Sequence, residues 1–441
     1  MNRALVFIAL AVSVLAISVL AASWWLNRPG QSVAPLPLVQ SVPGSSATRV
    51  SPSEPPASSP SPGQAEPGAR QPVAPGFKTI RPLPEIKLEP RIPELAKLEY
   101  LGNGRIEVAN ALVLVTGARG RLEVILPLAQ TVAKGALEAR PSLNEVDLSV
   151  YRREDYAGFG GPSPYFTASV PRDRLAEFLK LKPGDDYDRL WINPKTPEAP
   201  EVEANGATDP GVIEANPTLE GSGVELQAQQ ALQLEQAQNG FKPAHLAYYH
   251  GPPNSKRVAL TFDDAVHPMY APLLLEALAR GGAKATFFVV GRNVEAYPYF
   301  VRDLDRAGHE LANHTFHHVR LNNLPDAVIR DELERTNRIV SAITNKPVRF
   351  FRPPGGRYSS QVLQIARSLG MTTAFWTDDP GDFNNPGEVA LEKRTLGRIR
   401  RGGIILLHDN AQETAPILFE VLKDAREKGF ELVTLATQSG S

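Results

Sequence analysis

The chain has 441 residues, of which 47 are basic and 48 acidic, so a formal net charge of −1 gives no general attraction to nucleic acid. It contains no cysteine, which excludes disulfide scaffolds, thiolate metal sites, cysteine nucleophiles and iron–sulfur clusters. Any bound metal must therefore use histidine and carboxylate ligands. The 40 prolines and the low hydrophobic fraction of 42% indicate that part of the chain lies outside any folded core.

The first predicted element is a membrane segment within residues 1–28. An uncharged run covers residues 4–26, and a helix of this length spans roughly 34 Å at about 1.5 Å per residue, enough for a bilayer core of about 30 Å. Signal peptides have shorter hydrophobic regions of about 7 to 15 residues, and Trp24 and Trp25 are typical of an interface belt. We therefore expect a single-pass anchor in the cell membrane with the remaining chain outside; secretion after signal cleavage is the alternative.

Residues 29–94 predict a spacer. Between Pro29 and Pro93 lie 16 of the 40 prolines, interleaved with Ser, Ala and Gly. Such a stretch cannot bury enough apolar surface to offset its ordering entropy, so it is expected to be extended and solvated. A proline-rich ligand for a peptide-binding domain is the alternative, but no flanking basic pattern supports it.

Residues 95–195 have a globular composition and predict a small α+β accessory domain. Strands are expected at residues 111–115, 145–151 and 165–170, and helices at residues 122–137 and 173–179. The region contains no histidine and no site motif, so an accessory or spacing role is expected. Tyr156, Phe159 and Tyr165 are candidates for carbohydrate contact, although scattered aromatic residues more often belong to a core.

Residues 196–240 predict a second linker followed by a helix. Between Thr196 and Ser222 lie six acidic and no basic residues, with several prolines and glycines, and a solvent-exposed helix is expected at residues 224–239. The last domain is therefore assigned to residues 241–441.

This last domain alternates strand-like and helix-like segments. The expected segments are residues 257–262, 270–280, 285–289, 299–307, 310–313, 326–344, 348–351, 360–369, 372–375, 388–400, 404–407 and 414–428. Near-continuous apolar strands alternating with helices predict a parallel sheet covered by helices, either a barrel or a doubly wound fold. Active residues of such folds lie at the carboxyl ends of strands.

Metal-binding residue types follow two of these strands. Asp263 and Asp264 end the first strand, where two adjacent carboxylates repel each other unless a cation or base lies nearby. His314 and His318 follow another strand, and in a helical turn residues i and i+4 share a face, so both could bind one ion while His317 points elsewhere. All eight histidines lie in this last domain. The pattern is that of a catalytic divalent metal site, with zinc the favoured ion.

Three further strand ends carry polar residues. Arg352 opens a Pro-Pro-Gly-Gly segment, whose prolines stiffen the backbone, whose glycines permit close approach to a ligand and whose arginine can hold a carboxylate. An acidic segment at residues 378–382 follows another strand, and His408-Asp409 follows the last. A histidine at a strand end with an available acidic partner is suited to general acid catalysis.

Taken together, these motifs resemble the polysaccharide deacetylases with NodB homology, carbohydrate esterase family four. The resemblance covers about residues 248–434 and rests on five motifs in the family's order: Thr261-Phe262-Asp263-Asp264, His314-Thr315-x-x-His318, Arg352-Pro353-Pro354-x-Gly356, Asp379-x-x-Asp382-Phe383 and Leu406-Leu407-His408. It implies a distorted (β/α) barrel and metal-dependent removal of acetyl groups from N-acetylated glycans.

The resemblance also implies roles for individual residues. Asp264, His314 and His318 are its metal ligands, and Asp263 is the base that activates the attacking water. His408 is the acid that protonates the leaving amine, and Asp382 is the partner that orients it. Arg352 holds Asp263 as an anion, and the backbone N–H of Gly355 stabilises the developing oxyanion. The acetyl pocket is formed by Trp376, Phe383 and Leu406.

The chain departs from the family's pattern at three places. Ala265-Val266 stands where Gly-Pro is common, Gly355 where an aromatic residue is often found, and Phe383 where tryptophan is often found. These positions are steric and apolar, so they affect substrate contacts more than the chemistry.

The sequence leaves three functions to distinguish. The first is an anchored deacetylase of cell-envelope glycan, with N-acetylglucosamine or N-acetylmuramic acid of peptidoglycan as the expected substrate. The second is a deacetylase of a secreted poly-N-acetylglucosamine or chitin-like glycan, and the third a catalytically silent wall-binding protein. The intact metal ligands, base and acid disfavour the silent protein, and the sequence does not indicate an oligomeric state.

Overall fold

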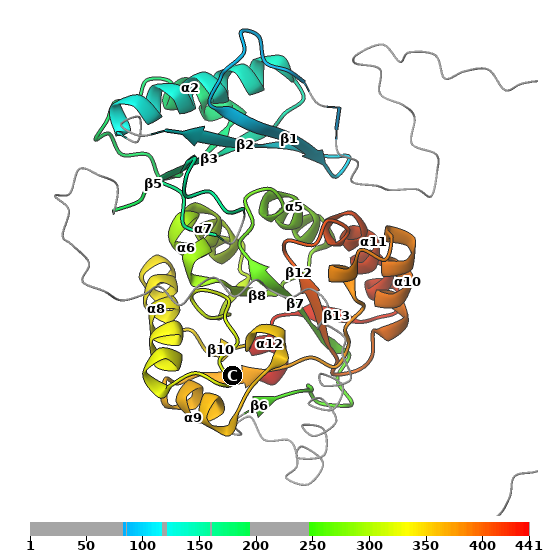
Figure 1. Ribbon diagram of the computed structural model, residues 1–441. Helices are drawn as coiled ribbons and strands as arrows, with labels where there is room; N and C mark the ends of the chain where they lie inside the picture. The colour runs from blue at the N-terminus through cyan, green and yellow to red at the C-terminus, as the bar shows by residue number, and fades with distance from the viewer. Residues whose placement is uncertain (1–82, 85, 117–120, 159–160, 195–246, 441) are drawn as a thin grey trace, which may run out of the picture. The chain divides into compact units, whose positions relative to one another are not determined.

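The computed structural model describes residues 83–84, 86–116, 121–158, 161–194 and 247–440. They form two β-sheets, each with helices of its own (Figure 1). The predicted membrane segment, most of the proline-rich spacer, the second linker with its helix, and Phe159 lie outside these residues. The described end of the spacer is not extended and solvated as predicted, because Leu88 is buried in the core of the smaller sheet and the Leu83 N–H donates to the Tyr100 carbonyl oxygen over 3.0 Å. Within the described part of the chain, no helix is both long and apolar enough to cross a bilayer.

The smaller sheet has five strands in the order β1-β2-β3-β4-β5. Its elements are β1 (Leu95–Gly102), β2 (Glu107–Val115), α2 (Leu122–Ala139), β3 (Glu145–Arg152), β4 (Phe166–Pro171), the 3-10 turn η2 (Arg172–Arg174), α3 (Leu175–Phe178) and β5 (Leu190–Ile192). Strands β2 and β3 are parallel because α2 carries the chain back across the sheet, and the other neighbours are antiparallel. The three predicted strands lie in β2, β3 and β4, whereas β1 and β5 were not predicted.

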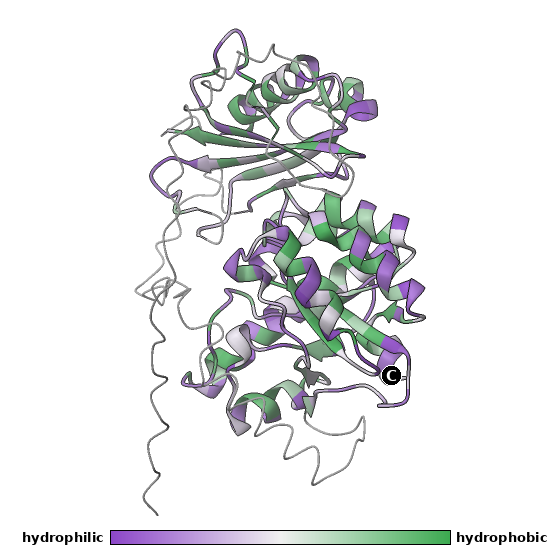
Figure 2. Ribbon diagram, turned by 90° about the vertical axis from the view of Figure 1, so that its right-hand side faces the viewer, coloured by the Kyte–Doolittle hydropathy of each residue, from purple (hydrophilic) through white to green (hydrophobic). Residues whose placement is uncertain are grey.

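One face of α2 supplies apolar side chains to the core of this sheet. Ile125, Ala129, Val132 and Ala136 recur every three or four residues and are all buried. They belong to one cluster with strand residues such as Val146. Figure 2 shows both hydrophobic and hydrophilic residues along this helix, the composition expected of a helix that covers one face of a sheet.

The larger sheet alternates strands and helices along the chain. Its elements are β6 (Ala247–Tyr248), β7 (Arg257–Ala265), α5 (Ala271–Gly281), β8 (Thr286–Val289), α6 (Gly291–Ala296), α7 (Pro298–Arg306), β9 (Glu310–Asn313), α8 (Asp326–Thr344), β10 (Phe350–Phe351), η4 (Pro354–Gly356), α9 (Ser360–Ser368), β11 (Thr372–Ala374), η5 (Asp382–Asn384), α10 (Glu388–Arg398), β12 (Ile404–His408), α11 (Thr414–Glu427), β13 (Glu431–Val433) and α12 (Leu435–Ser439). The twelve segments predicted for this domain are all present; β9 and α8 have the predicted ends, and the other ten have shifted ends.

The strands of the larger sheet form an almost closed circuit. They follow the order β12-β7-β8-β9-β10-β11-β6, all pairs are parallel, and β13 pairs with β7 outside this path. A parallel bridge between Asp378, which follows β11, and Ile405 of β12 joins the two sides. This circuit is consistent with the predicted distorted (β/α) barrel, and it brings the carboxyl ends of the strands to one rim.

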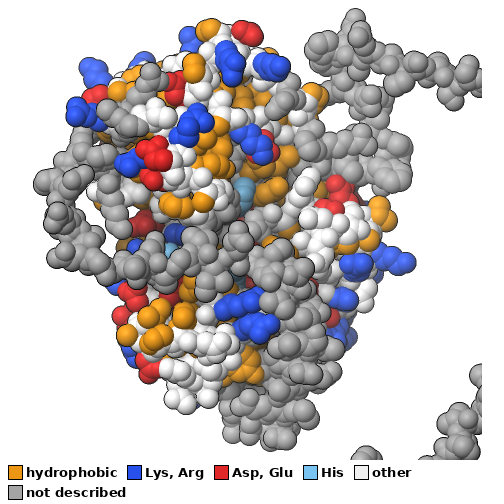
Figure 3. Space-filling model, viewed as in Figure 1, with side chains coloured by type: hydrophobic (Ala, Val, Ile, Leu, Met, Phe, Trp, Pro, Cys, Tyr) orange, Lys and Arg blue, Asp and Glu red, His pale blue; other side chains and the backbone are white. Residues whose placement is uncertain are grey.

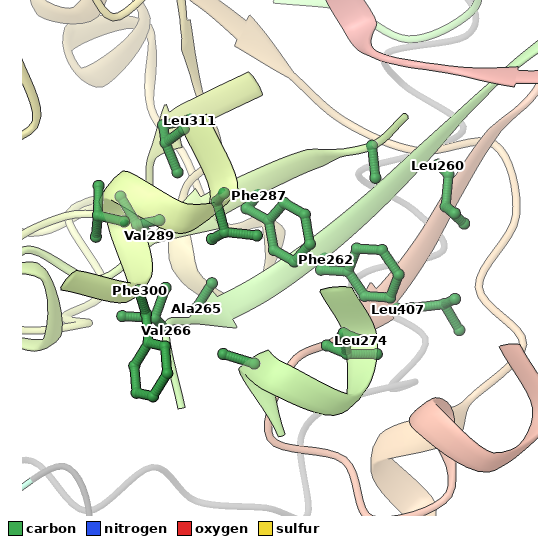
Figure 4. Close-up of a cluster of buried hydrophobic side chains, with 14 of the residues drawn as sticks. Leu260, Phe262, Ala265, Val266, Leu274, Phe287, Val289, Phe300, Leu311 and Leu407 are labelled. Atoms are coloured by element: carbon green, nitrogen blue, oxygen red, sulfur yellow. The ribbon is translucent and has the colours of Figure 1, made fainter. Parts of the chain in front are cut away.

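The core of this domain lies between the strands and the surrounding helices. Residues 258–265 of β7 are all buried, as expected for a parallel strand that is covered on both faces. The ring of Phe262 on β7 stacks on that of Phe287 on β8, with centroids 4.9 Å apart, and Leu274 of α5 and Leu407 of β12 lie in the same cluster (Figure 4). This packing fixes the position of β7, and the two adjacent aspartates, Asp263 and Asp264, lie at the end of that strand.

Polar side chains of the smaller sheet contact helices of the larger domain within the compact unit of residues 72–441. The hydroxyl groups of Ser149 and Tyr297 lie 3.0 Å apart, and Arg189 Nη1 lies 2.5 Å from Asp303 Oδ2. Asn103 Nδ2 donates to Glu276 Oε2 over 2.7 Å. The contact with Tyr297 gives the buried hydroxyl of Ser149 a partner, without which its burial would be costly.

Candidate active site

Side chains from several strand ends line one small pocket. Nine of the predicted site residues line a cavity of about 30 Å³: Asp263, Asp264, His314, His318, Gly355, Trp376, Phe383, Leu406 and His408. The other two, Arg352 and Asp382, lie behind this lining with 0% of their surface exposed. The structure therefore brings all eleven predicted site residues together, although they span nearly 150 positions of the sequence.

Three side chains are placed to hold a metal ion. Donor atoms of Asp264, His314 and His318 all lie within 4.8 Å of one another. Asp264 Oδ1 is 3.0 Å from His318 Nε2 and 3.6 Å from His314 Nε2. Burial raises the pKa of Asp264, but the neighbouring imidazoles of His318, His408 and His314 outweigh it and hold the pKa below its usual range. Asp264 is thus an anion, the form that binds metal.

His314 presents a lone pair toward the carboxylates. Its Nδ1 lies 2.8 Å from the backbone carbonyl oxygen of Arg352, which can only accept, so Nδ1 carries the proton. Burial lowers the pKa of His314 to about 4, so the ring is neutral at pH 7. Its Nε2 is then an acceptor that faces the carboxylate of Asp264. A backbone partner on the second nitrogen is the arrangement that typically orients a metal-bound histidine.

The segment from His314 to His318 is not the helical turn that the i, i+4 spacing predicted. It is a loop after β9 in which Thr315 and His318 have φ angles of +66° and +58°. The two left-handed residues, rather than a helical repeat, turn both imidazoles toward Asp264. The expectation that His317 points elsewhere is met, since its Nδ1 lies 2.6 Å from Glu332 Oε1 on α8.

Asp263 is held by a buried arginine. Arg352 Nη1 lies 2.6 Å from Asp263 Oδ1 and also donates to the Thr261 hydroxyl over 2.9 Å. The remaining guanidinium nitrogens donate to the carbonyl oxygens of Ala374 and Phe375. Asp263 Oδ2 lies on the side of the metal ligands, 3.7 Å from His314 Nε2. The predicted contact between Arg352 and this carboxylate is therefore present.

His408 is paired with Asp382 rather than with the adjacent Asp409. Its Nδ1 lies 2.8 Å from Asp382 Oδ1, and its backbone N–H donates to Asp382 Oδ2 over 2.7 Å. Burial by itself lowers the pKa of His408, but Asp382 outweighs it and raises the pKa well above its usual value. Asp409 instead accepts from the backbone N–H of His267, so the acidic neighbour in sequence is not the partner.

Apolar groups flank these polar residues. The rings of Phe383 and His408 are 5.3 Å apart, and Trp376 and Leu406 are buried beside them in the pocket lining. Gly355 has a φ of +62°, a conformation that glycine adopts without strain. The pocket thus combines an apolar wall with a histidine that can donate a proton.

Three residues at this site had no role in the sequence analysis. Asp379 lines the pocket, and burial raises its pKa. Asn410 donates its side-chain amide to Asp264 Oδ2 over 3.2 Å, and Glu332 holds the loop between the histidines. Asp379 is the first residue of the fourth motif and Asn410 follows the fifth motif, which was the available signal for both, whereas Glu332 had none.

A larger cavity of about 270 Å³ lies elsewhere in the domain, beside His309 and Glu310 at the start of β9. None of the predicted site residues lines it, so it is separate from the pocket described above.

Comparisons with known proteins agree with the motif assignment. Residues 250–374 match a family model described as polysaccharide deacetylase. A peptidoglycan-N-acetylglucosamine deacetylase of Bacillus cereus is 32% identical over 201 residues, which are 44% of this chain and 94% of that protein. A chitooligosaccharide deacetylase of Azorhizobium caulinodans is 32% identical over 169 residues, which are 38% of this chain and 80% of that protein.

Among solved structures, a pseudoenzyme of carbohydrate esterase family 4 from Bacillus anthracis is 34% identical, with a TM-score of 0.43. The match covers 45% of this chain and 70% of that one. The Bacillus cereus relative is matched over nearly its whole length. The chain therefore belongs to the polysaccharide deacetylases, carbohydrate esterase family four.

Proposed function

We propose that the protein is a metal-dependent hydrolase that removes acetyl groups from N-acetylated sugars of a cell-envelope polysaccharide, with peptidoglycan as the principal substrate. One observation carries the proposal: a carboxylate and two imidazoles converge within 4.8 Å, in a pocket that also contains Asp263 and His408. Such a pocket combines a candidate metal site, a base and an acid, which amide hydrolysis requires.

Asp264, His314 and His318 would hold the ion. Two imidazoles and one carboxylate suit zinc, and a chain without cysteine has no thiolate to offer instead. The donor set fits a cation for a reason specific to this chain: the His314 lone pair and the Asp264 carboxylate are both acceptors, yet they face each other at 3.6 Å. When bound, the ion lowers the pKa of water and stabilises negative charge on a carbonyl oxygen.

Asp263 takes a proton from the attacking water in this proposal. Arg352 engages its Oδ1, which leaves Oδ2 on the side of the metal ligands. The water oxygen forms a bond to the acetyl carbon while the carbonyl oxygen gains negative charge. By family resemblance, the backbone N–H of Gly355 stabilises that charge.

His408 completes the reaction by donating a proton to the leaving nitrogen. Because Nδ1 faces Asp382, the proton on Nε2 is the one available to the pocket. The C–N bond breaks as that proton is transferred, and the products are acetate and a free amine on the sugar. The raised pKa of His408 keeps the ring protonated at neutral pH, which a general acid needs.

The acetyl methyl group is assigned to the apolar wall of the pocket. Trp376, Phe383 and Leu406 line the pocket together with His408, and their apolar surfaces suit a methyl group. The substrate sugar would then lie across the open side of the pocket.

No nucleic-acid partner is proposed. Among the described residues on the face drawn in Figure 3, basic and acidic side chains lie interspersed with hydrophobic and uncharged ones and form no basic stripe of the kind that binds a phosphate backbone. The near-zero formal charge of the whole chain points the same way.

The relatives of this chain are named for two different glycan substrates. The Bacillus cereus relative is named a peptidoglycan deacetylase, whereas the Azorhizobium relative is named a chitooligosaccharide deacetylase. The predicted anchor and the spacer of residues 29–94 favour peptidoglycan, because they would hold the catalytic domain beside the wall on the outer side of the membrane. A secreted poly-N-acetylglucosamine or chitin-like glycan is the second candidate.

Acetate release from three substrates distinguishes these functions. The zinc-loaded protein is incubated with purified peptidoglycan, with poly-N-acetylglucosamine and with chitin oligomers, and the rate is compared at equal acetyl concentration. The proposal expects the highest kcat/KM on peptidoglycan. Faster release of acetate from poly-N-acetylglucosamine or from chitin oligomers would favour the second candidate. No release from any of the three substrates would indicate a silent wall-binding protein.

A further inference from the structure

The loop that carries the two candidate metal-binding histidines has a backbone that its own sequence does not favour. Thr315 and His318 both adopt left-handed φ angles, of +66° and +58°, which residues with a Cβ rarely occupy. Such conformations persist where the surrounding structure holds them. The groups that contact residues 315–318 therefore decide where the two imidazoles lie.

One acidic side chain on α8 binds three hydrogen-bond donors of this loop. Glu332 Oε2 accepts from the backbone N–H groups of Phe316 and His317, each over 2.9 Å. Its Oε1 lies 2.6 Å from His317 Nδ1. Only 4% of the Glu332 surface is exposed, so water does not compete freely for these donors. A buried carboxylate that accepts from backbone N–H groups forms strong, charge-assisted hydrogen bonds.

The same loop is fixed from two further sides. Asn313 Oδ1 accepts from the Thr315 N–H over 2.8 Å, while the Asn313 amide donates to the carbonyl oxygen of Leu333 on α8 over 2.9 Å. At the start of α6, the N–H groups of Gly291 and Arg292 donate to the carbonyl oxygens of Thr315 and Phe316. The carbonyl groups of Thr315 and Phe316 are thus held by α6, and the N–H groups of Phe316 and His317 by Glu332 on α8.

We propose that Glu332 is a positioning residue for the metal site: it fixes the loop between His314 and His318 so that both imidazoles face Asp264. The inference rests on the metal-dependent function proposed above. Removing the carboxylate leaves the buried N–H groups of Phe316 and His317 without their acceptor, and the loop can then leave its left-handed conformation. Partners that orient metal ligands typically change metal affinity by about 10- to 100-fold when removed, which is the effect expected here.

Zinc affinity, measured by competition with a chromophoric chelator, tests this role directly. Glu332→Ala is expected to weaken zinc binding by about 10- to 100-fold relative to wild type. Glu332→Gln is expected to restore most of the affinity, because its amide oxygen can accept from both N–H groups while its amide nitrogen donates to His317. Glu334→Ala is the matched control, since Glu334 lies on the same helix, pairs with Arg330 at the surface and does not contact the loop.

The outcomes separate this inference from the proposed function. If wild type binds zinc tightly and Glu332→Ala binds it equally well, Glu332 does not position the site. If wild type itself binds no zinc, the proposed metal dependence fails instead. If Glu332 had a purely structural role, Glu332→Ala and Glu332→Gln would both lower the melting temperature of the apo-protein, and the two variants would bind zinc with equal affinity. Should Glu332→Ala fail to fold, Glu332→Asp, which keeps the charge but is one methylene shorter, carries the same prediction of weakened zinc binding.

Discussion

Arg352 Nη1 lies 2.6 Å from Asp263 Oδ1, and the arginine side chain is fully buried. Because Thr261 and two backbone carbonyl groups fix the guanidinium, it holds the carboxylate in one orientation. Oδ1 is occupied by this contact, and Oδ2 is the oxygen that remains near the metal ligands. The two adjacent aspartates therefore have different partners: Arg352 for Asp263, and the two histidines for Asp264.

This difference predicts that Asp263→Asn loses catalysis but keeps metal. An amide cannot take the proton of water, so kcat is expected to fall by about a hundredfold or more, a typical general-base contribution. Acetate release and metal content are measured on the same preparation. A variant that lost its metal would show that Asp263 is a ligand, and the assigned division between the two aspartates would be wrong.

The pair of His408 and Asp382 predicts a pH effect. His408 must be protonated to act as an acid, so activity is lost as the pH rises through its pKa. Burial lowers that pKa and Asp382 raises it, with Asp382 prevailing in the native protein. Asp382→Asn removes the largest of the contributions that raise this pKa, ahead of those of Asp264 and Asp263, so the alkaline limb of the kcat profile should move to lower pH. An unmoved limb, with kcat merely reduced, would mean that His408 is not the acid titrating there.

A companion variant checks the identity of that group. His408→Ala is expected to reduce kcat at all pH values and to abolish the alkaline limb assigned to His408, while zinc stays bound because Asp264, His314 and His318 are intact. Retention of the same alkaline limb in His408→Ala would assign it to another residue.

The buried ion pair predicts a stability effect that a double mutant can resolve. Arg352→Met leaves the Asp263 carboxylate, 7% exposed, without its cation, and should lower the free energy of unfolding by about 3 to 5 kcal/mol. Adding Asp263→Asn removes the unpaired charge, so the double mutant should be more stable than Arg352→Met alone. Denaturant titration monitored by circular dichroism measures both. Additive losses would show that the two residues do not depend on each other.

The proposed topology predicts the N-terminus of the mature protein. If residues 4–26 form a retained anchor, the protein from a membrane fraction begins at or near Met1 and is released by detergent but not by high salt. Mass spectrometry of the intact protein provides the measurement. A mature chain that starts near residue 24 would favour cleavage and remove the anchor from the proposal.

Much of the active-site composition was predictable because each motif follows a strand of a parallel sheet. Hydrophobic runs such as residues 258–262 identify buried strands, and the carboxyl ends of parallel strands meet at one rim. The sequence alone therefore assigns Asp263, His314 and His408 to one pocket. The helix at residues 326–344 was predicted with the observed bounds because its apolar spacing is sustained over many turns.

The remaining features depend on three-dimensional contacts that the sequence does not reveal. Helix α6 has six residues, too few for a periodic pattern. Strand β1 was missed, although Lys97, Leu98, Glu99 and Tyr100 show the polar–apolar alternation of a half-buried strand. The left-handed φ of Thr315 and His318 has no sequence signal, since neither residue is glycine. Glu332 is one of several acidic residues on α8, and only its burial against the loop distinguishes it.

Metal-dependent acetate release tests the central claim most directly. The purified protein is stripped with a chelator, dialysed, and assayed on purified peptidoglycan before and after addition of one equivalent of zinc, beside a His314→Ala variant treated in the same way. The account predicts no release from the stripped protein, recovery with zinc in wild type, and no recovery in His314→Ala. Acetate release that is unchanged by the chelator, or a His314→Ala variant that keeps both stoichiometric zinc and activity, would contradict it.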